Sequence, residues 1–335
     1  MLPTSVPLFS AKKALGILVL VAFVVVEVSS IVEAAGSLKL GFSGASSSQL
    51  AGYIAVDQKL FAKYGLDVDL DQSGGTTMIQ ALGVGVLDVA LVGGGQAISG
   101  YLKGIEVRII SGLVNYIPYE LWVRPEISDV KDLKGKKFAT STPGTSPDMS
   151  TRLLLEQLHL DPGKDVQLIR FGRLQLIAPA LIGGVVDAAL LSPPYSTEAR
   201  KAGIRMLLDL ASKRIPFPFT SVISTQAVLQ KSSPLLEGFL KGILHGIKFS
   251  YSNPEIARKA LGRYLRLSDA EVIEETYKRT LEVSERIPFV PPQAIDTFVR
   301  LSGESSARSA AGVLEMRILR QIESEGFVNG LYSGK

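Results

Sequence analysis

Short apolar runs alternate with amphipathic stretches through the first two thirds of the chain. Runs rich in β-branched and aliphatic residues, bounded by Gly, Ser and Asp, predict buried strands at 38–42, 68–70, 89–92, 137–140, 166–169 and 188–191. Residues 50–64 and 149–158 carry apolar side chains at helical spacing. Strands that alternate with helices indicate right-handed βαβ crossovers and a parallel sheet. The pattern therefore predicts an α/β fold.

An internal repeat divides this region into two similar halves. Residues 81–91 match residues 180–190 at an offset of 99 positions (180 − 81), and they share Ala-Leu, a Gly, an Asp and a second Ala-Leu. The same offset places Ser47 over Ser146. Self-similarity at one offset is typical of duplicated structural units, so we expect two α/β lobes. The shared Asp is expected to cap the turn into the strand that follows it.

Two extended segments predict how the lobes are joined. Residues 119–124 are apolar and strand-like and lead from the first lobe to the second, and residues 215–224, which contain two prolines, lead back. Two such crossings make a hinge. We therefore expect lobe one over 36–123 and 224–335, and lobe two over 124–223.

The last third of the chain has a helical pattern. Asn253-Pro254 is expected to open a helix with Pro in its first turn. The stretch from Ser268 to Glu271 resembles a capping box that starts the next helix. We expect this region to complete lobe one and to contribute no chemistry.

The N-terminal segment, residues 1–35, has the features of a secretory signal. Lys12 and Lys13 precede an apolar run over 14–26, and small residues follow at 34–36. The run is shorter than the ~20 residues that span a bilayer, which favours a cleaved signal peptide over the alternative, a retained membrane anchor. The chain has no cysteine, which excludes disulfides and a lipid-bearing cysteine. We therefore expect a free monomer in the periplasm, not a lipoprotein.

Charge and motifs exclude several other classes of protein. The formal net charge of +4 is spread thinly along 335 residues, so no nucleic-acid partner is expected. The two histidines form no zinc motif, and no phosphate loop or nucleophile elbow is present. We expect no catalytic residue, no metal site and no cofactor.

The candidate binding residues lie in loops at the carboxyl ends of the predicted strands, where ligands bind in open α/β sheets. Gly, Ser and Thr before helix N-termini present backbone N–H groups and hydroxyls. Arg173 could hold an anion with its guanidinium, and Tyr195 could stack on an organic body. The expected ligand-binding residues are Ser47, Thr76, Gly94, Gly95, Gln96, Thr145, Ser146, Arg173 and Tyr195.

Five stretches together carry a family resemblance. They are Leu60-Phe61-Ala62-Lys63-Tyr64-Gly65-Leu66-Asp67-Val68, Gly74-Gly75-Thr76, Asp132-Leu133-Lys134-Gly135-Lys136, Gly184-Val185-Val186-Asp187-Ala188 with Pro193-Pro194, and Asn253-Pro254-Glu255. In this order and spacing the chain resembles the periplasmic solute-binding proteins of nitrate/sulfonate/taurine-type ABC transporters, a group that includes the thiamine-precursor-binding, NMT1/THI5-like proteins. The resemblance implies a type II periplasmic binding protein fold that closes like a Venus flytrap and delivers its solute to a membrane permease.

The resemblance leaves the ligand and one alternative function open. The ligand it implies is a small organic or inorganic anion or a similar solute, such as a sulfonate, nitrate or a pyrimidine-like molecule. The same fold hosts thiamine-pyrimidine synthases and menaquinone-pathway lyases, which the sequence resembles in outline. Export argues against these enzymes, because their substrates are cytosolic. A sensor domain is a further alternative, but the chain carries no signalling module.

Overall fold

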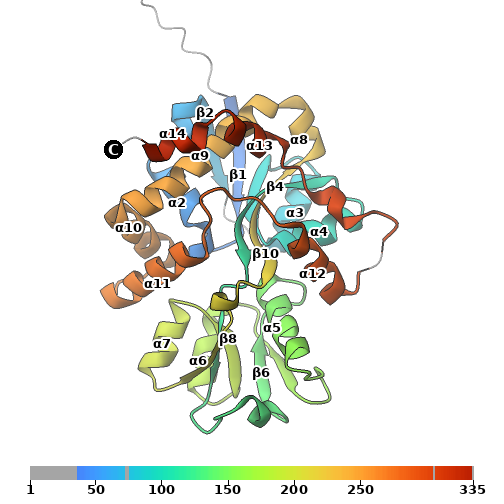
Figure 1. Cartoon of the computed structure of the whole chain (residues 1–335), viewed down its shortest axis with the longest axis vertical. Helices are drawn as coiled ribbons and strands as arrows, with labels where there is room; N and C mark the ends of the chain where they lie inside the picture. The colour runs from blue at the N-terminus through green and yellow to red at the C-terminus, as the bar shows by residue number, and fades with distance from the viewer. Residues whose placement is uncertain (1–35, 72–74, 305, 334–335) are drawn as a thin grey trace, which may run out of the picture. The chain divides into compact units, whose positions relative to one another are not determined.

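The computed structural model describes residues 36–71, 75–304 and 306–333, which belong to one compact unit over Gly36–Lys335 (Figure 1). The expected signal peptide over 1–35, with its cleavage site at Ala34 or Ala35, lies outside the described residues. Within the described ranges, no helix combines the length and the apolar character needed to cross a membrane.

The first sheet forms the core of lobe one. Its strands are β1 (Gly36–Phe42), β2 (Leu66–Asp71), β3 (Val89–Val92), β4 (Val107–Tyr116) and β10 (Pro216–Thr225), in the order β2-β1-β3-β10-β4. β1 pairs in parallel with β2 and β3, as the βαβ pattern predicts. The long strand β10 returns antiparallel between β3 and β4.

The second sheet forms the core of lobe two and repeats this topology. Its strands are β5 (Glu120–Val123), β6 (Lys137–Thr140), β7 (Gln167–Arg170), β8 (Ala188–Leu191) and β9 (Arg205–Asp209), in the order β7-β6-β8-β5-β9. β6 is parallel to β7 and β8, and β5 runs antiparallel between β8 and β9. The predicted pair of α/β lobes is confirmed.

The repeated Asp has the same structural role in both lobes, and this role differs from the expected turn cap. Asp88 Oδ2 accepts a hydrogen bond from Lys39 N at 2.8 Å, and Asp187 Oδ2 accepts one from Lys137 N at 2.8 Å. In each lobe the carboxylate therefore joins the residue before the third strand to the backbone of the first strand. A cap would satisfy groups in its own turn, whereas this Asp fixes the register of two neighbouring parallel strands.

The chain crosses between the sheets at residues 117–119 and 210–215, so both crossings come earlier in the chain than the boundaries expected at 123 and 224, and the second comes at least nine residues earlier (224 − 215). The difference arises because β5 pairs with lobe-two strands and β10 pairs with lobe-one strands along their whole lengths. The two crossings are also bonded to each other. Ile117 N donates to Ile215 O at 3.2 Å, and Leu210 N donates to Tyr119 O at 3.1 Å.

Helices cover the sheets of both lobes. In the repeated region they are α2 (Leu50–Asp57), α3 (Gly75–Gly83), α4 (Gly94–Leu102), α5 (Ser146–Gln157), α6 (Ile177–Ile182) and α7 (Tyr195–Lys201), with short 3₁₀ turns η1 (Ser47–Gln49), η2 (Phe61–Tyr64), η3 (Val130–Leu133), η4 (Leu174–Leu176) and η5 (Ala211–Lys213). The helix expected over 50–64 is interrupted, because Lys59 adopts a left-handed conformation with φ of 51° between α2 and η2.

The C-terminal helices are α8 (Gln226–Lys231), α9 (Ser233–Ser252), α10 (Pro254–Leu265), α11 (Ala270–Val283), α12 (Pro292–Ser302), α13 (Arg317–Ser324) and α14 (Phe327–Ser333), with η6 (Ala310–Val313). α10 begins at Pro254, as predicted. The capping box expected from Ser268 is wrong, because the N-cap of α11 is Asp269. Its Oδ1 accepts hydrogen bonds from Glu271 N at 2.9 Å and Val272 N at 3.1 Å.

Candidate functional site

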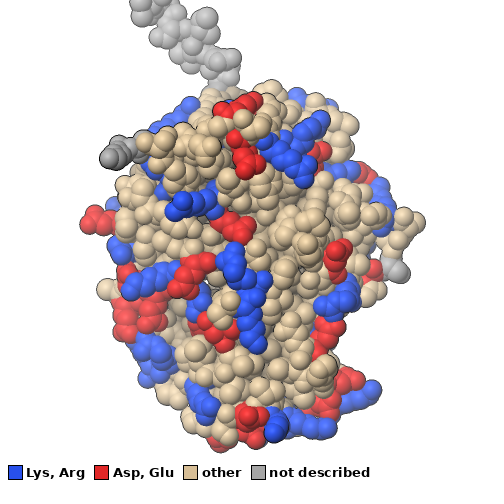
Figure 2. Space-filling model, viewed as in Figure 1, with Lys and Arg blue, Asp and Glu red and all other residues tan. Residues whose placement is uncertain are grey.

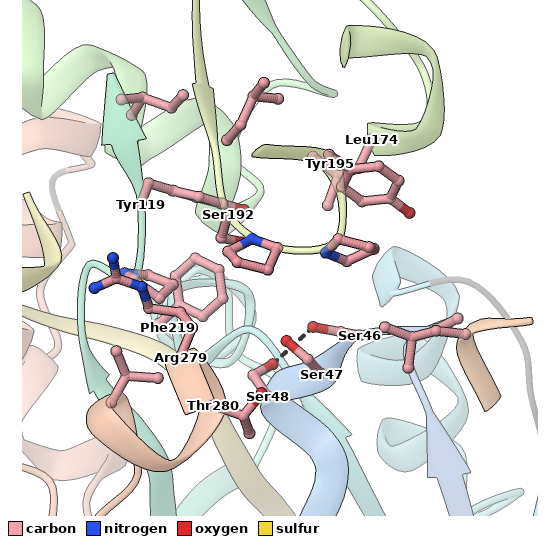
Figure 3. A pocket seen from close by; sticks show the side chains of 18 residues that line it. Ser46, Ser47, Ser48, Tyr119, Leu174, Ser192, Tyr195, Phe219, Arg279 and Thr280 are labelled. Carbon is pink, nitrogen blue, oxygen red and sulfur yellow. Dashed lines mark hydrogen bonds between the residues drawn. The ribbon is translucent and has the colours of Figure 1, made fainter. Parts of the chain in front are cut away.

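A pocket lies between the two lobes beside the first crossing, and 18 residues line it (Figure 3). Both lobes contribute to it. From lobe one come η1 and part of α11, and from lobe two come the end of β8 and the start of α7. The polar or aromatic lining residues are Ser46, Ser47, Ser48, Tyr119, Ser192, Tyr195, Phe219, Arg279 and Thr280; the others are Ala45, Pro118, Leu174, Leu190, Leu191, Pro193, Pro194, Leu265 and Val283.

The lobe-one side of the pocket is a row of hydroxyls before α2. Gly44, with φ of 88°, turns the chain at the end of β1, a conformation that favours glycine. Ser46 Oγ lies 2.8 Å from Ser48 Oγ, which lies 2.7 Å from Thr220 Oγ1 on β10. Ser46 N donates to the hydroxyl of buried Tyr53 at 3.1 Å. These bonds hold the row in place, so the pocket presents preoriented neutral hydroxyls.

The lobe-two side is a stiff loop that ends in an aromatic residue. β8 leads through Ser192, Pro193 and Pro194 to Tyr195, the first residue of α7. The prolines restrict the backbone of this loop. In Figure 3 the loop faces the Ser46–Ser48 row across the pocket. Burial raises the pKa of the Tyr195 phenol, so this side chain is neutral at physiological pH.

The first crossing and strand β10 supply a second pair of aromatic rings. Tyr119 and Phe219 meet edge to face, with ring centroids 5.3 Å apart, which is a favoured geometry for aromatic pairs. Burial raises the pKa of Tyr119 as well. Tyr119 and Phe219 therefore give this part of the pocket an aromatic wall.

Arg279 is the charged residue of the lining, and it is already paired. Its guanidinium donates to Glu120 Oε1, lies 3.1 Å from Glu282 Oε2 and lies 3.7 Å from Asp209 Oδ1. The other oxygen of buried Glu120 accepts a hydrogen bond from Trp122 Nε1 at 2.8 Å. Because Arg279 is on α11 and Glu120 begins β5, this cluster joins the two lobes beside the hinge.

In this conformation the pocket is too small for an organic molecule. The cavity is about 40 Å³, whereas ligand pockets usually measure ~300–1,000 Å³. A neighbouring groove of about 420 Å³ shares Pro193 and Arg279 with the pocket. In this arrangement the two lobes therefore leave little free space at the pocket.

Charged side chains hold the lobes together on one side, where α7 approaches α11. Arg200 Nη2 lies 2.7 Å from Glu271 and 2.6 Å from Glu275, and Lys201 Nζ lies 2.9 Å from Asp269 and 3.0 Å from Glu271. We call these five residues the interlobe clasp. Acidic and basic side chains meet over these two helices in Figure 2. On the other side, Arg300 of α12 pairs with Glu156 of α5.

The clasp predicts that closure depends on pH. Lys201 holds the pKa of Asp269 below its ordinary value, and Arg200 does the same for Glu271. A carboxylate with a lowered pKa contributes its full stabilisation above its ordinary pKa, here 3.8 and 4.5, and loses it as the pH falls further. We expect the lobes to separate progressively below about pH 4, as small-angle scattering would show.

A variant without the clasp gives the control for this pH dependence. Arg200→Gln with Lys201→Gln removes both cations, so the radius of gyration should no longer respond to acid in the range where far-UV circular dichroism still reports a folded chain. An acid expansion that persists unchanged in this variant would show that other groups control closure.

The structure brings two of the expected binding residues to the pocket. Ser47 and Tyr195 line it, one from each lobe. Thr76 is in the first turn of α3, but its side chain lies outside the described residues. Arg173 is exposed before η4, and it is absent from the pocket lining.

In lobe one, the other expected binding residues lie in α4, and the two glycines form packing contacts with neighbouring elements. A Cβ at Gly94 would lie 2.7 Å from Pro218 and Ser221 side-chain atoms, and one at Gly95 would lie 2.2 Å from Phe298. These glycines therefore allow α4 to pack closely on β10 and α12, and Gln96 continues the same helix without reaching the pocket.

In lobe two, the N-terminus of α5 is also engaged within the protein. Ser146 is buried, and its Oγ donates to Phe219 O of β10 at 3.0 Å. Thr145 Oγ1 donates to Thr142 O at 2.6 Å. Ser146 is thus an interlobe contact, although it occupies the position equivalent to Ser47 in the repeat.

Sequence reasoning missed most of the pocket. Tyr119 and Phe219 are in the segments that predicted the hinge, so their position at the crossings was a usable signal. Arg279 and Thr280 carried no local signal, because they are ordinary positions of an amphipathic helix. The expectation that the C-terminal region contributes no chemistry is therefore wrong for α11, which supplies three lining residues.

The described residues contain no group of three or more His, Asp or Glu side chains that could hold a metal ion. His159 is exposed and left-handed, with φ of 55°, after the end of α5. His245 Nδ1 lies 3.1 Å from the Tyr64 hydroxyl, and burial lowers the pKa of the imidazole. Neither histidine lines the pocket.

Comparison with known proteins is consistent with this architecture. The model of the family described as NMT1/THI5 like matches residues 47–257, which is more than half of the chain. The chain belongs to the NMT1/THI5-like family. The matched region begins in η1 at the pocket and continues into α10, so it includes both crossings and every strand of the two sheets except β1.

Relatives of this family member have names that describe binding proteins. YtlA of Bacillus subtilis, named as a binding protein, is 25% identical over 272 residues, which cover 71% of this chain and 81% of YtlA. A Brachyspira hyodysenteriae protein, named as an ABC transporter periplasmic binding protein, is 27% identical over 258 residues, or 72% of each chain.

Solved structures show that this NMT1/THI5-like chain has the periplasmic binding protein fold. The periplasmic aliphatic sulphonate binding protein SsuA of Escherichia coli superposes with a TM-score of 0.68 at 19% identity, over 80% of this chain and 91% of SsuA. The predicted fold class is confirmed.

Proposed function

We propose that this protein is the substrate-binding component of an ABC uptake transporter and that it captures a small solute between its lobes. The observation that carries the proposal is the pocket itself, because its lining comes from both lobes and from the first crossing. Rotation about the crossings changes the size of such a pocket, so solute capture and lobe closure are linked.

The family and its relatives support this function and its cellular context. Relatives carry the names of binding proteins, one of them a periplasmic protein of an ABC transporter. We infer that this chain acts in the periplasm after export through its N-terminal segment and passes its solute to a membrane permease.

We infer binding without turnover. The pocket places hydroxyls from Ser46, Ser47 and Ser48 at its surface, but its 18 lining residues include neither a histidine nor a carboxylate. A serine nucleophile needs an adjacent base within hydrogen-bond reach. The lining offers hydroxyls and aromatic rings that can bind a solute, and binding alone is sufficient for capture.

Tyr195→Ala tests the proposal. The substitution removes an aromatic face from the pocket, and we expect affinity for the native solute to fall by roughly tenfold to a hundredfold, since an aromatic contact and its buried area are worth ~1.5–3 kcal/mol. Native mass spectrometry of protein purified from the periplasm would identify the solute, and calorimetric titration would give both affinities.

Tyr332→Ala is the matched control, because it removes the same side chain from α14, which contributes nothing to the pocket lining. Its affinity should equal that of the parent. If the two variants bound the solute equally well, the capture site would lie elsewhere.

A further inference from the structure

We propose that the solute of this pocket is uncharged: a small molecule with a flat apolar body and a hydrogen-bonding edge, rather than a sulfonate or carboxylate. This inference rests on the proposed function, because it takes the interlobe pocket as the capture site. The sequence left both an anion, held by Arg173 and helix N-termini, and a pyrimidine-like solute open, and the inference excludes the anion.

The charges around the pocket disfavour an anion. Arg279 is the one charged residue among the lining residues, and its guanidinium faces three carboxylates, those of Glu120, Glu282 and Asp209. Its closest partner, Glu120, is buried, with 7% of its side chain exposed. An anionic solute would have to compete with this carboxylate for the same cation, and it would approach the carboxylates at short range.

We expect the Arg279–Glu120 ion pair to persist when the lobes open. Glu120 directly follows the first crossing, so it lies next to the axis about which the lobes would turn. Residues near a rotation axis move least, so we expect Arg279 to stay close to Glu120 when the lobes rotate far enough to admit a solute.

Groups of the protein also lie close to two helix N-termini that could otherwise receive an anion. At the start of α5, Asp148 is buried, and its Oδ2 accepts a hydrogen bond from Gly144 N at 3.1 Å. The first turn of α4 packs against β10 at Gly94. The loop N–H of Gly144 before α5 is therefore bonded within the protein, and the close packing of α4 on β10 leaves little room for an anion beside Gly94.

What remains at the pocket surface is neutral. Tyr119, Tyr195 and Phe219 offer aromatic faces and edges, and the Ser46–Ser48 row and Ser192 offer hydroxyls that can donate or accept. Hydroxyls satisfy the amide, carbonyl or sulfonamide edge of an uncharged molecule. A buried ion held by such groups alone would bear a large desolvation cost.

A matched pair of probes tests the inference directly. Benzenesulfonamide and benzenesulfonate have nearly the same size and shape and differ in charge at pH 7. We expect the sulfonamide to bind at least tenfold more tightly, measured by ligand-observed NMR titration up to millimolar concentration, and Tyr195→Ala to weaken it. Equal binding, tighter binding of the sulfonate, or binding of neither probe would overturn the inference.

The two proposals can fail separately in this experiment. If the sulfonamide is preferred but Tyr195→Ala and the parent bind it equally, the probe occupies another site and the proposed function loses its pocket. If Tyr195→Ala weakens binding of the sulfonate and the sulfonate is preferred, the pocket is correct and the uncharged-solute inference is wrong.

Glu120→Gln distinguishes an electrostatic role of Glu120 in ligand selection from a purely structural role. The variant removes the main countercharge of Arg279, so the ratio of sulfonate to sulfonamide affinity should rise about tenfold. Glu282→Gln is the control, because that side chain is 61% exposed and should change the ratio little. If Glu120→Gln weakened both probes by the same factor, Glu120 would only support the fold, and the charge argument would be overturned.

Discussion

Charge reversal at Arg200 and Lys201 should open the lobes in the absence of solute. The double variant Arg200→Glu with Lys201→Glu replaces four attractive interlobe contacts by repulsion from Asp269, Glu271 and Glu275. Exposed ion pairs are individually weak, but several that share partners act together. We expect the ratio of closed to open protein to fall by about one order of magnitude at low ionic strength.

The natural absence of cysteine makes this measurement straightforward. Spin labels on cysteines introduced at exposed Lys259 in lobe one and exposed Lys131 in lobe two would report the interlobe distance without background labelling. The distance distribution of the double variant should move to longer values, and salt should produce a similar shift in the parent.

The matched control reverses two charges within lobe two. Lys134→Glu with Lys164→Glu changes the net charge by the same amount and disturbs only the pairs with Asp165 and Asp161. The interlobe distance of this control should equal that of the parent. If both double variants opened equally, net charge rather than the clasp would determine closure.

Loss of the buried Asp148 carboxylate should strongly lower the free energy of unfolding. The side chain of Asp148 is 1% exposed and accepts hydrogen bonds from Thr140 Oγ1 at 3.0 Å, Gly144 N at 3.1 Å and Arg152 Nε at 2.9 Å. Asp148→Ala leaves these donors without their acceptor. We expect the free energy of unfolding to fall by about 2–4 kcal/mol and the melting temperature to fall by roughly 5–12 °C.

Asp161→Ala is the control for this prediction, because its carboxylate is 48% exposed and pairs with Lys164, which is 82% exposed. It should change the stability by less than about 0.5 kcal/mol. Differential scanning fluorimetry of the two variants would suffice. Equal melting temperatures for Asp148→Ala and the parent would mean that water replaces the carboxylate in the loop before α5.

The local sequence pattern was sufficient to predict many of the secondary-structure elements and their order along the chain. The runs at 89–92, 137–140 and 188–191 match β3, β6 and β8 residue for residue, because a short apolar segment between turn-forming residues can only be buried as a strand of this length. Pro254 marked the start of α10, because proline suits the first turn of a helix and disrupts its interior. The repeat at residues 81–91 and 180–190 revealed the two lobes, since duplicated patterns give duplicated packing.

Only the tertiary structure decided which of these residues meet. Gly94, Gly95 and Ser146 have the composition of binding loops, yet they serve contacts with β10 and α12, because a glycine that admits a ligand and one that admits a neighbouring element look the same in sequence. Arg279, 159 residues after Glu120, reaches that carboxylate through helix packing. The net charge of a site depends on all the charged groups that folding brings together. It therefore cannot be predicted from any single segment of the sequence.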